Sequence, residues 1–225
     1  MLKLSGEVLG GDAERGINAE SFHRIADEIA QLNSQGIRLG IVPGGGNFLR
    51  GRDVAFIERV SADRVAMTST ILNGLALQAA LDQKGIESII QCPFSFAFAD
   101  PINPRRARQA LDQGQVVIFV GGVGEPLVST DMASAIRAVE IKAQLLLKAS
   151  NIDGVYNKDP DKHPDAKRFE TVSFEEVIEN RLQVMDLVAF DICCQQQIPI
   201  LVFDVRTPGN MTQVMENPKL GTLIH

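Results

Sequence analysis

The feature that most constrains this sequence is an apolar run that ends in consecutive glycines. The run Ile37–Val42 is followed by Pro43 and then by the glycines of Gly44–Gly46. Glycines leave their backbone N–H groups unshielded and adopt φ and ψ values that other residues avoid. Such a loop at the end of a buried strand can surround phosphate oxygens with N–H donors, and Arg50 can add charged donors nearby. A tight turn alone would explain the glycines equally well.

Similar junctions elsewhere in the chain favour the phosphate interpretation. Further apolar strands are expected at Met1–Leu4, Ile86–Gln91, Gln115–Val120, Leu145–Ala149 and Ile200–Asp204. They alternate with helical segments through short connections, which predicts an α/β fold. We expect a three-layer sandwich, with a mainly parallel central sheet covered by helices on both faces. Because Met1–Leu4 is short for a core strand, we also expect the native strand to begin upstream of Met1.

The loops that follow these strands should lie together. Ligands of parallel sheets bind at the carboxyl ends of the strands. In this chain the loops at those ends are Ser5-Gly6, Gly44–Gly46, Gly121-Gly122 and Asn151–Asp159. Several glycine loops at one edge of a sheet therefore predict a polyphosphate that lies along that edge.

Composition limits the function classes further. The chain has 225 residues, of which 45% are hydrophobic and 22% charged, which predicts one large folded domain or two small ones. The net charge of −6 argues against nucleic acid or a membrane surface as the main partner, and no apolar run approaches the roughly 18 residues of a membrane span. No C-x-x-C pair occurs among the cysteines, so we expect reduced thiols in a cytoplasmic protein. The histidines are too scattered for a metal site, and none is expected.

The residues at this edge suit phosphoryl transfer without a common nucleotide motif. The P-loop spacing is absent, and Gly122-Val123-Gly124 lacks the third glycine of a dinucleotide loop. Phosphoryl transfer needs positioning and charge neutralisation more than covalent help. Lys3, at the end of a strand, and Arg50 would neutralise charge on the transferred group. Asp131 and Asp186 would orient Lys3 or a metal on the nucleotide, although helix capping is the simpler role for both aspartates.

Several short motifs follow one another along the whole chain. They are Lys3–Glu7, Gly44–Gly51, Ala62-Asp63, Asn73–Ala76, Leu147–Ser150, Asp153–Tyr156 with Asp159-Pro160, Val184–Asp186 and Gly221–Leu223. Each motif alone is weak, but together and in this order they are specific. The sequence resembles bacterial UMP kinase (uridylate kinase), of the amino-acid kinase superfamily.

The resemblance implies transfer of the ATP γ-phosphate to UMP, giving UDP and ADP in pyrimidine nucleotide biosynthesis, with Mg²⁺ bound to ATP. It also implies a single amino-acid kinase domain over residues 1–225 and a homohexamer in the cytoplasm. By matching position, ATP would contact Lys3, Leu4, Ser5, Gly6, Gly46, Arg50, Ser150, Tyr156 and Asp159. UMP would contact Gly45, Asp63, Val123, Gly124, Glu125, Pro126, Leu127, Val128, Ser129 and Thr130. Asp63 offers acceptors to ribose hydroxyls; Tyr156 would flank the adenine, or else is only a packed aromatic at a turn.

The segment Val123–Thr130 departs from the family pattern, because it lacks a hydroxyl and an amide and gains the carboxylate of Glu125. Two alternatives stay open. The first is a kinase of the same fold that makes an acyl phosphate from a carboxylate or carbamate. The second is a relative that binds a nucleotide or an oxoanion without catalysis. Many family members are activated by GTP through basic residues where this chain has Gln78 and Asp82, so we expect weak or absent GTP activation.

Overall fold

A single mixed sheet runs through the molecule. The structure is a computed structural model that describes residues 1–11, 15–49 and 56–225. Within these residues, nine strands form one sheet in the order β4-β3-β5-β2-β1-β6-β8-β9-β7. Neighbouring strands are parallel except for β8 and β9, which are antiparallel. The strands are β1 (Leu2–Leu4), β2 (Gly40–Pro43), β3 (Ser88–Cys92), β4 (Asp100–Pro101), β5 (Val116–Phe119), β6 (Leu146–Ser150), β7 (Thr171–Val172), β8 (Ile200–Asp204) and β9 (Thr222–Ile224).

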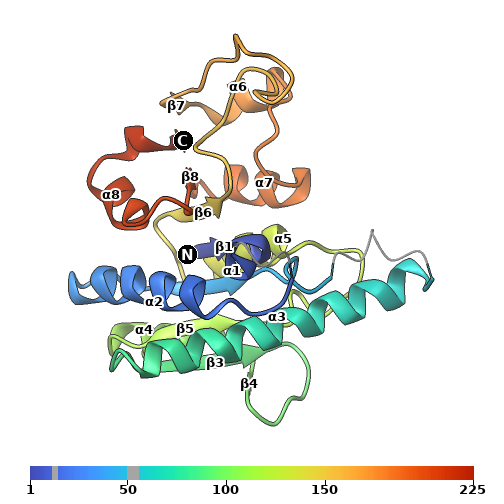
Figure 1. The fold of residues 1–225 in the computed structure, drawn as a ribbon, viewed down its shortest axis with the longest axis vertical. Helices are drawn as coiled ribbons and strands as arrows, with labels where there is room; N and C mark the ends of the chain where they lie inside the picture. Colours follow the sequence, from blue (N-terminus) through green and yellow to red (C-terminus); the bar gives the residue numbers. More distant parts are fainter. Residues whose placement is uncertain (12–14, 50–55) are drawn as a thin grey trace.

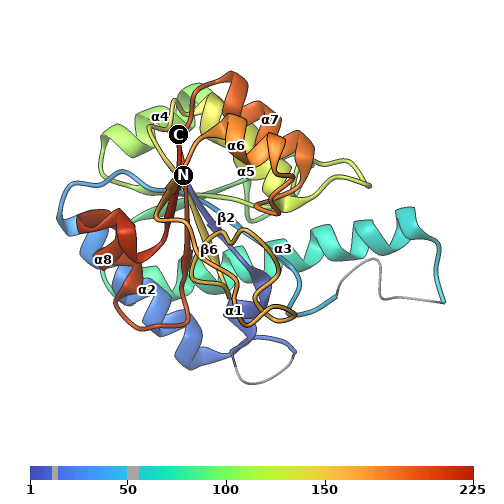
Figure 2. The same cartoon turned by 90° about the horizontal axis from the view of Figure 1, so that it is seen from above.

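Helices cover both faces of this sheet (Figures 1 and 2). One face carries α1 (Gly6–Gly10), α2 (Ala19–Ser34), α3 (Arg59–Asp82) and α8 (Asn210–Glu216). The other carries α4 (Pro104–Asp112), α5 (Thr130–Glu140), α6 (Phe174–Glu179) and α7 (Leu187–Gln195). A short 3₁₀ helix, η2 (Pro218–Leu220), precedes β9. The predicted three-layer α/β sandwich is therefore confirmed.

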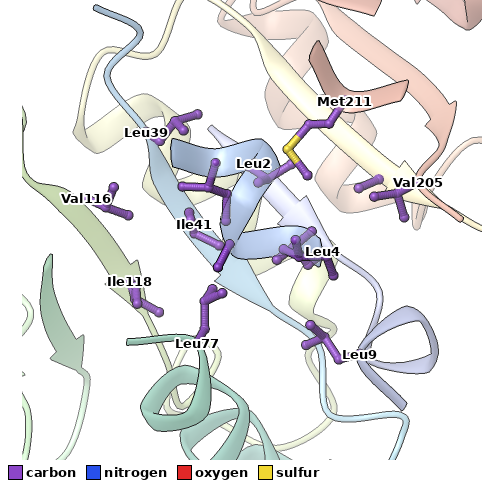
Figure 3. Close-up of a cluster of buried hydrophobic side chains, with 14 of the residues drawn as sticks. Leu2, Leu4, Leu9, Leu39, Ile41, Leu77, Val116, Ile118, Val205 and Met211 are labelled. Atoms are coloured by element: carbon purple, nitrogen blue, oxygen red, sulfur yellow. The ribbon is translucent and has the colours of Figure 1, made fainter. Parts of the chain in front are cut away.

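The core consists of two groups of buried side chains, one on each face of the sheet. Leu2 and Leu4 of β1, with Ile41 of β2, are fully buried on the α2–α3 face (Figure 3). Val42 and Val117 are buried on the opposite face. Successive residues of a strand point to opposite faces, so a strand covered on both sides needs a continuous apolar run. This is why the central strands could be recognised in the sequence.

The helix α3 lies unusually close to β5 at one glycine. A Cβ atom on Gly74 would lie 2.3 Å from Cγ1 of Val120, so no larger residue fits without movement. A glycine inside a helix costs about 1 kcal/mol relative to alanine, and the close helix–sheet contact explains its presence here. This approach brings the first half of α3 alongside the carboxyl ends of β2 and β5.

No helix in the described part of the chain is both long enough and apolar enough to cross a membrane. The cysteines are free thiols: Cys92 and Cys193 are buried, and Cys194 is partly exposed.

Candidate active site

Two lysines and an aspartate meet at the carboxyl ends of the central strands. β1 and β6 are parallel neighbours, and their register pairs Lys3 directly with Lys148. Asp131, in the first turn of α5, lies between the two ammonium groups. Its Oδ1 is 3.0 Å from Nζ of Lys3, and its Oδ2 is 2.7 Å from Nζ of Lys148. The structure thus brings together Lys3 and Asp131, two of the residues proposed for catalysis, and adds Lys148.

The electrostatics of this cluster follow from its burial. The side chains of Lys3 and Lys148 are each 12% exposed, and that of Asp131 is 15% exposed. Burial alone would raise the pKa of Asp131, but the two lysines outweigh it and hold the pKa at about 2. Burial also lowers the pKa of Lys148, and Asp131 opposes this effect. Two poorly hydrated lysines thus face one carboxylate directly, and the charge of the nearby Asp186 also raises the pKa of Lys148. The two ammonium groups are the donors that this cluster offers to an added anion.

A second carboxylate joins the first turns of two helices beside this cluster. Asp186 caps α7 by accepting a hydrogen bond from the Ala189 N–H at 2.9 Å. Its other oxygen accepts a hydrogen bond from the hydroxyl of Ser129. Ser129 in turn caps α5 by accepting from the Met132 N–H at 3.1 Å. Capping is thus the observed role of Asp186, whereas Ser129, and not Asp131, caps α5.

Two glycine loops predicted to bind phosphate, Ser5-Gly6 and Gly44–Gly46, pack against each other through their backbones. A Cβ atom on Gly6 would lie 2.3 Å from the backbone N of Gly46, and the Gly44 N–H donates to the Leu4 carbonyl at 2.8 Å. A Cβ atom on Gly45 would lie 2.7 Å from the Ala66 carbonyl of α3. These contacts leave no room for side chains, so glycines are needed here for close backbone approach.

A buried pair of amides holds this loop against α3. Asn47 and Asn73 exchange two hydrogen bonds of 2.8 and 3.0 Å, and Asn73 Nδ2 also donates to the Gly44 carbonyl at 2.6 Å. Both side chains are essentially inaccessible to solvent. Their donors and acceptors are paired with each other and with backbone, which is the condition for burying polar groups at low cost.

The segment Val123–Thr130 connects β5 to α5 and contacts α3. Asp63 of α3 accepts a hydrogen bond from the Leu127 N–H at 2.9 Å and from Arg59 Nε at 2.9 and 3.0 Å. Leu127 has a φ of +66°, a left-handed conformation that is uncommon for a leucine. Its side chain is 66% exposed. Asp63 is therefore placed next to the segment predicted to bind the same substrate.

The remaining predicted residues have local contacts. Ser150 ends β6, the strand that carries Lys148. In the loop that follows, the hydroxyl of Tyr156 donates to Asp153 at 2.8 Å, and Asp159 forms an exposed ion pair with Lys162 at 2.8 Å. Leu4 and Ser5 continue from Lys3 at the end of β1. Arg50, predicted to contact both phosphates, lies outside the described residues.

The sequence predicted no functional role for Lys148 and no supporting role for the Asn47–Asn73 pair. The signal for Lys148 was a charged residue inside an otherwise apolar run, since Leu145–Ala149 reads Leu-Leu-Leu-Lys-Ala. A lysine is almost never buried unless it is paired. Its position in that run therefore predicts an acidic partner, although it does not say which one.

The whole chain is similar to known proteins in sequence and in fold. The sequence model of the amino acid kinase family matches residues 1–204. The chain is similar to a solved UMP kinase from Bacillus anthracis, with a TM-score of 0.95 and 35% identity over 100% of this chain and 94% of that chain. It is also similar to a UMP kinase from Ureaplasma parvum, with a TM-score of 0.94 and 31% identity over 99% of this chain and 96% of that chain. A uridylate kinase from Archaeoglobus fulgidus shares the fold, with a TM-score of 0.74 and 24% identity over 100% of this chain and 98% of that chain.

Proposed function

The chain belongs to the amino acid kinase family, and we propose that it is an ATP-dependent UMP kinase that acts in pyrimidine nucleotide biosynthesis. The observation that carries the proposal is the cluster of Lys3, Asp131 and Lys148 at the carboxyl ends of adjacent strands. This cluster lies where parallel sheets bind ligands, and the glycines of Gly44–Gly46 follow the next strand, β2. The similarity to two UMP kinases at 35% and 31% identity supports UMP as the acceptor.

In the proposed reaction an oxygen of the UMP phosphate attacks the γ-phosphorus of ATP. A new P–O bond forms, the bond from the γ-phosphorus to the β–γ bridging oxygen breaks, and UDP and ADP result. The attacking phosphate is already largely ionised at neutral pH, so no general base is required. Lys3 and Lys148 would stabilise the charge on the transferred phosphoryl group, because both are held in place before the substrate arrives.

The roles of the other residues follow from their places at this edge of the sheet. ATP would contact Lys3, Leu4, Ser5, Gly6, Gly46, Arg50, Ser150, Tyr156 and Asp159, and UMP would contact Gly45, Asp63 and Val123–Thr130. Asp63 would keep the hydrogen bond from the Leu127 N–H to its Oδ2 and offer its Oδ1 to the ribose hydroxyls. Arg59 Nε, which donates to both oxygens in the structure, would give up Oδ1 or share it with the ribose. Asp131 and Asp186 would act in catalysis by orienting the lysines and the first turns of α5 and α7.

The oxygens of both carboxylates already have partners in the protein, so Mg²⁺ would arrive bound to the nucleotide. Asp131 bridges two lysines, and Asp186 accepts hydrogen bonds from Ser129 and Ala189. Among the residues that the structure describes, no group of three or more His, Cys, Asp or Glu could hold a metal. Asp186 would be the side chain that approaches Mg²⁺ on ATP, and the bound ion would add positive charge next to the transferred group.

The proposal extends to assembly and location. We infer one kinase domain over residues 1–225, because the chain covers almost the full length of the UMP kinases that it resembles. From the resemblance to bacterial UMP kinase we also propose a homohexamer in the cytoplasm. Light scattering of the purified protein tests the assembly. A mass close to that of six chains is expected, and a monomer would contradict this part of the proposal.

The decisive test is ADP release with Mg-ATP and separate acceptors: UMP, CMP, dUMP, glutamate and carbamate. We expect turnover with UMP above all others. Turnover with glutamate or carbamate would keep the fold and replace the acceptor by a carboxylate. Binding of Mg-ATP without turnover of any acceptor would indicate a non-catalytic relative, and would point to Val123–Thr130 as the cause.

A further inference from the structure

A buried carboxylate in α2 has no role in the cluster described above. Glu28 is 3% exposed, although it lies on the face of α2 that otherwise packs with Ile25 and Ile29 into the core. An unpaired carboxylate at such a place would be strongly unfavourable. Glu28 has two partners. Its Oε1 accepts from Arg24 Nη1 at 3.2 Å, and its Oε2 accepts from the Met211 N–H at 2.9 Å.

The partners of Glu28 hold both ends of one loop. Met211 is in the first turn of α8, and Arg24 Nη1 also donates to the Val205 carbonyl at 2.7 Å, directly after β8. The pair Arg24–Glu28 therefore ties α2 to the beginning and to the end of the β8–α8 connection (Figures 1 and 2 show α2 next to α8). At its start, the Val205 N–H donates to the Ser150 carbonyl at 3.0 Å. The loop is thus fixed to α2 on one side and to the end of β6 on the other.

The fixed loop presents an arginine. Arg206 lies between the two anchored ends and forms hydrogen bonds of 2.8 to 3.3 Å with both carboxylate oxygens of Asp204. Its side chain is 61% exposed. It borders a hollow of about 410 Å³ whose lining also includes Arg24, Glu7, Glu20, Asn18 and Asn151.

The hollow lies next to residues that are proposed to bind the donor nucleotide. Glu7 directly follows the Lys3–Gly6 segment, and Asn151 directly follows Ser150. The hollow thus adjoins two segments that are proposed to bind ATP. Because Asp204 balances the charge of Arg206, the guanidinium suits the uncharged purine and ribose better than the phosphates. A guanidinium plane stacks on aromatic rings and donates several fixed hydrogen bonds.

We propose that Arg206 contacts the nucleoside part of ATP in this hollow, and that Glu28 and Arg24 are positioning residues that hold the β8–α8 loop for this contact. The inference rests on the proposed function in taking ATP as the donor and Lys3–Gly6 and Ser150 as residues that contact it. The alternative is that the Arg24–Glu28 pair merely stabilises the packing of α2 on α8. The positioning role and the packing role differ in one prediction for a folded variant that lacks the Glu28 carboxylate. Only the positioning role predicts weaker binding of the nucleotide.

Titration calorimetry with Mg-ATP tests the proposal on the full chain. The variants are Glu28→Gln, Arg206→Ala and the double variant, with Asp27→Asn as the matched control, since Asp27 is the neighbouring α2 carboxylate and its ion pair with Lys84 is exposed. We expect each single variant to raise the Kd of Mg-ATP about tenfold, the scale of one hydrogen bond to a charged group. The double variant should be no weaker than Arg206→Ala, because Glu28 acts through the loop that carries Arg206. The control and the KM for UMP should not change.

Several results would overturn the inference. An unchanged Kd in Glu28→Gln with a lower unfolding temperature would reduce Glu28 to packing. Additive losses in the double variant would separate Glu28 from Arg206, and an unchanged Kd in Arg206→Ala would remove the hollow from the donor site. If Glu28→Gln does not fold, Glu28→Asp replaces it, since it keeps the charge beside Arg24 but draws the carboxylate back from the Met211 N–H, and it should raise the Kd similarly. Failure of the unaltered protein to bind Mg-ATP would instead reject the proposed function itself.

Discussion

The cluster at the strand ends makes a quantitative prediction for Asp131→Asn. Burial raises the pKa of Asp131, but the two lysines outweigh it and lower the pKa from 3.8 to about 2. This is a difference of about 2.5 kcal/mol between the charged and neutral forms, at about 1.4 kcal/mol per pKa unit. The side chain is 15% exposed, so solvent screening reduces this value only modestly. Asparagine resembles the neutral form and leaves two buried lysines side by side. We expect the free energy of unfolding to fall by about 2 kcal/mol at neutral pH, or somewhat more.

The same pKa shift predicts a pH dependence. Because the pKa of Asp131 is lower in the folded than in the unfolded chain, its contribution is complete above about pH 4 and is lost as the pH falls toward about 2. Urea unfolding followed by circular dichroism should therefore show that the unaltered protein and Asp131→Asn converge in stability in acid. About 1 kcal/mol of the difference should be lost by about pH 3.

The matched control for this experiment is an exposed ion pair. Arg38 and Asp112 pair with side chains that are 59% and 64% exposed. Asp112→Asn should cost well under about 1 kcal/mol, as exposed pairs generally do. If Asp131→Asn and Asp112→Asn lose equal stability, or if the loss in Asp131→Asn does not depend on pH, the argument from burial is wrong.

Further predictions concern the same edge of the sheet and its support. Lys3→Ala should lower kcat about 100- to 1,000-fold in ADP-release assays with little change in KM, since one preorganised donor is lost; a loss confined to KM would mean that Lys3 only binds substrate. Lys148→Met should lower kcat on a similar scale, and an unchanged kcat would restrict catalysis to Lys3. Gly6→Ala should abolish Mg-ATP binding in calorimetry, because its Cβ would lie 2.3 Å from the Gly46 backbone N; normal affinity would show that the two loops can separate. Gly74→Ala should lower the thermal unfolding midpoint, and adding Val120→Ala should recover part of it if the 2.3 Å contact is the cause.

The sequence predicted those parts of the fold that depend on local pattern. Continuous apolar runs identified the central strands, because a strand buried on both faces has no polar side. The run that ends in Gly44–Gly46 located one phosphate loop, and Lys3 was recognised from its place at a strand end. The helices α1 and α8 were not predicted. α1 begins and ends with glycine, and a Cβ on Gly6 would meet the loop Gly44–Gly46, so tertiary contact and not propensity stabilises it.

No local sequence pattern could predict that the two lysines of the cluster lie side by side. Lys3 and Lys148 are far apart in the sequence and meet because β1 and β6 are neighbours in a register that pairs these two residues. A shift of one residue would move Lys148 to the other face of the sheet. Similarly, Asp63 could be proposed as a ribose acceptor from its motif, but its hydrogen bond to the Leu127 N–H follows only from the approach of α3 to the β5–α5 connection.

Asp131 explains how a buried, positively charged site can exist before its substrates bind. Two lysines at 12% exposure would be unstable together, so the carboxylate between them is needed in the empty enzyme. When ATP and UMP bind, their phosphates bring more negative charge to the same place and can take over part of this role. The stability lost in Asp131→Asn should therefore shrink when Mg-ATP is bound. An equal loss with and without nucleotide would mean that the phosphates do not approach these lysines, and would contradict the proposed site.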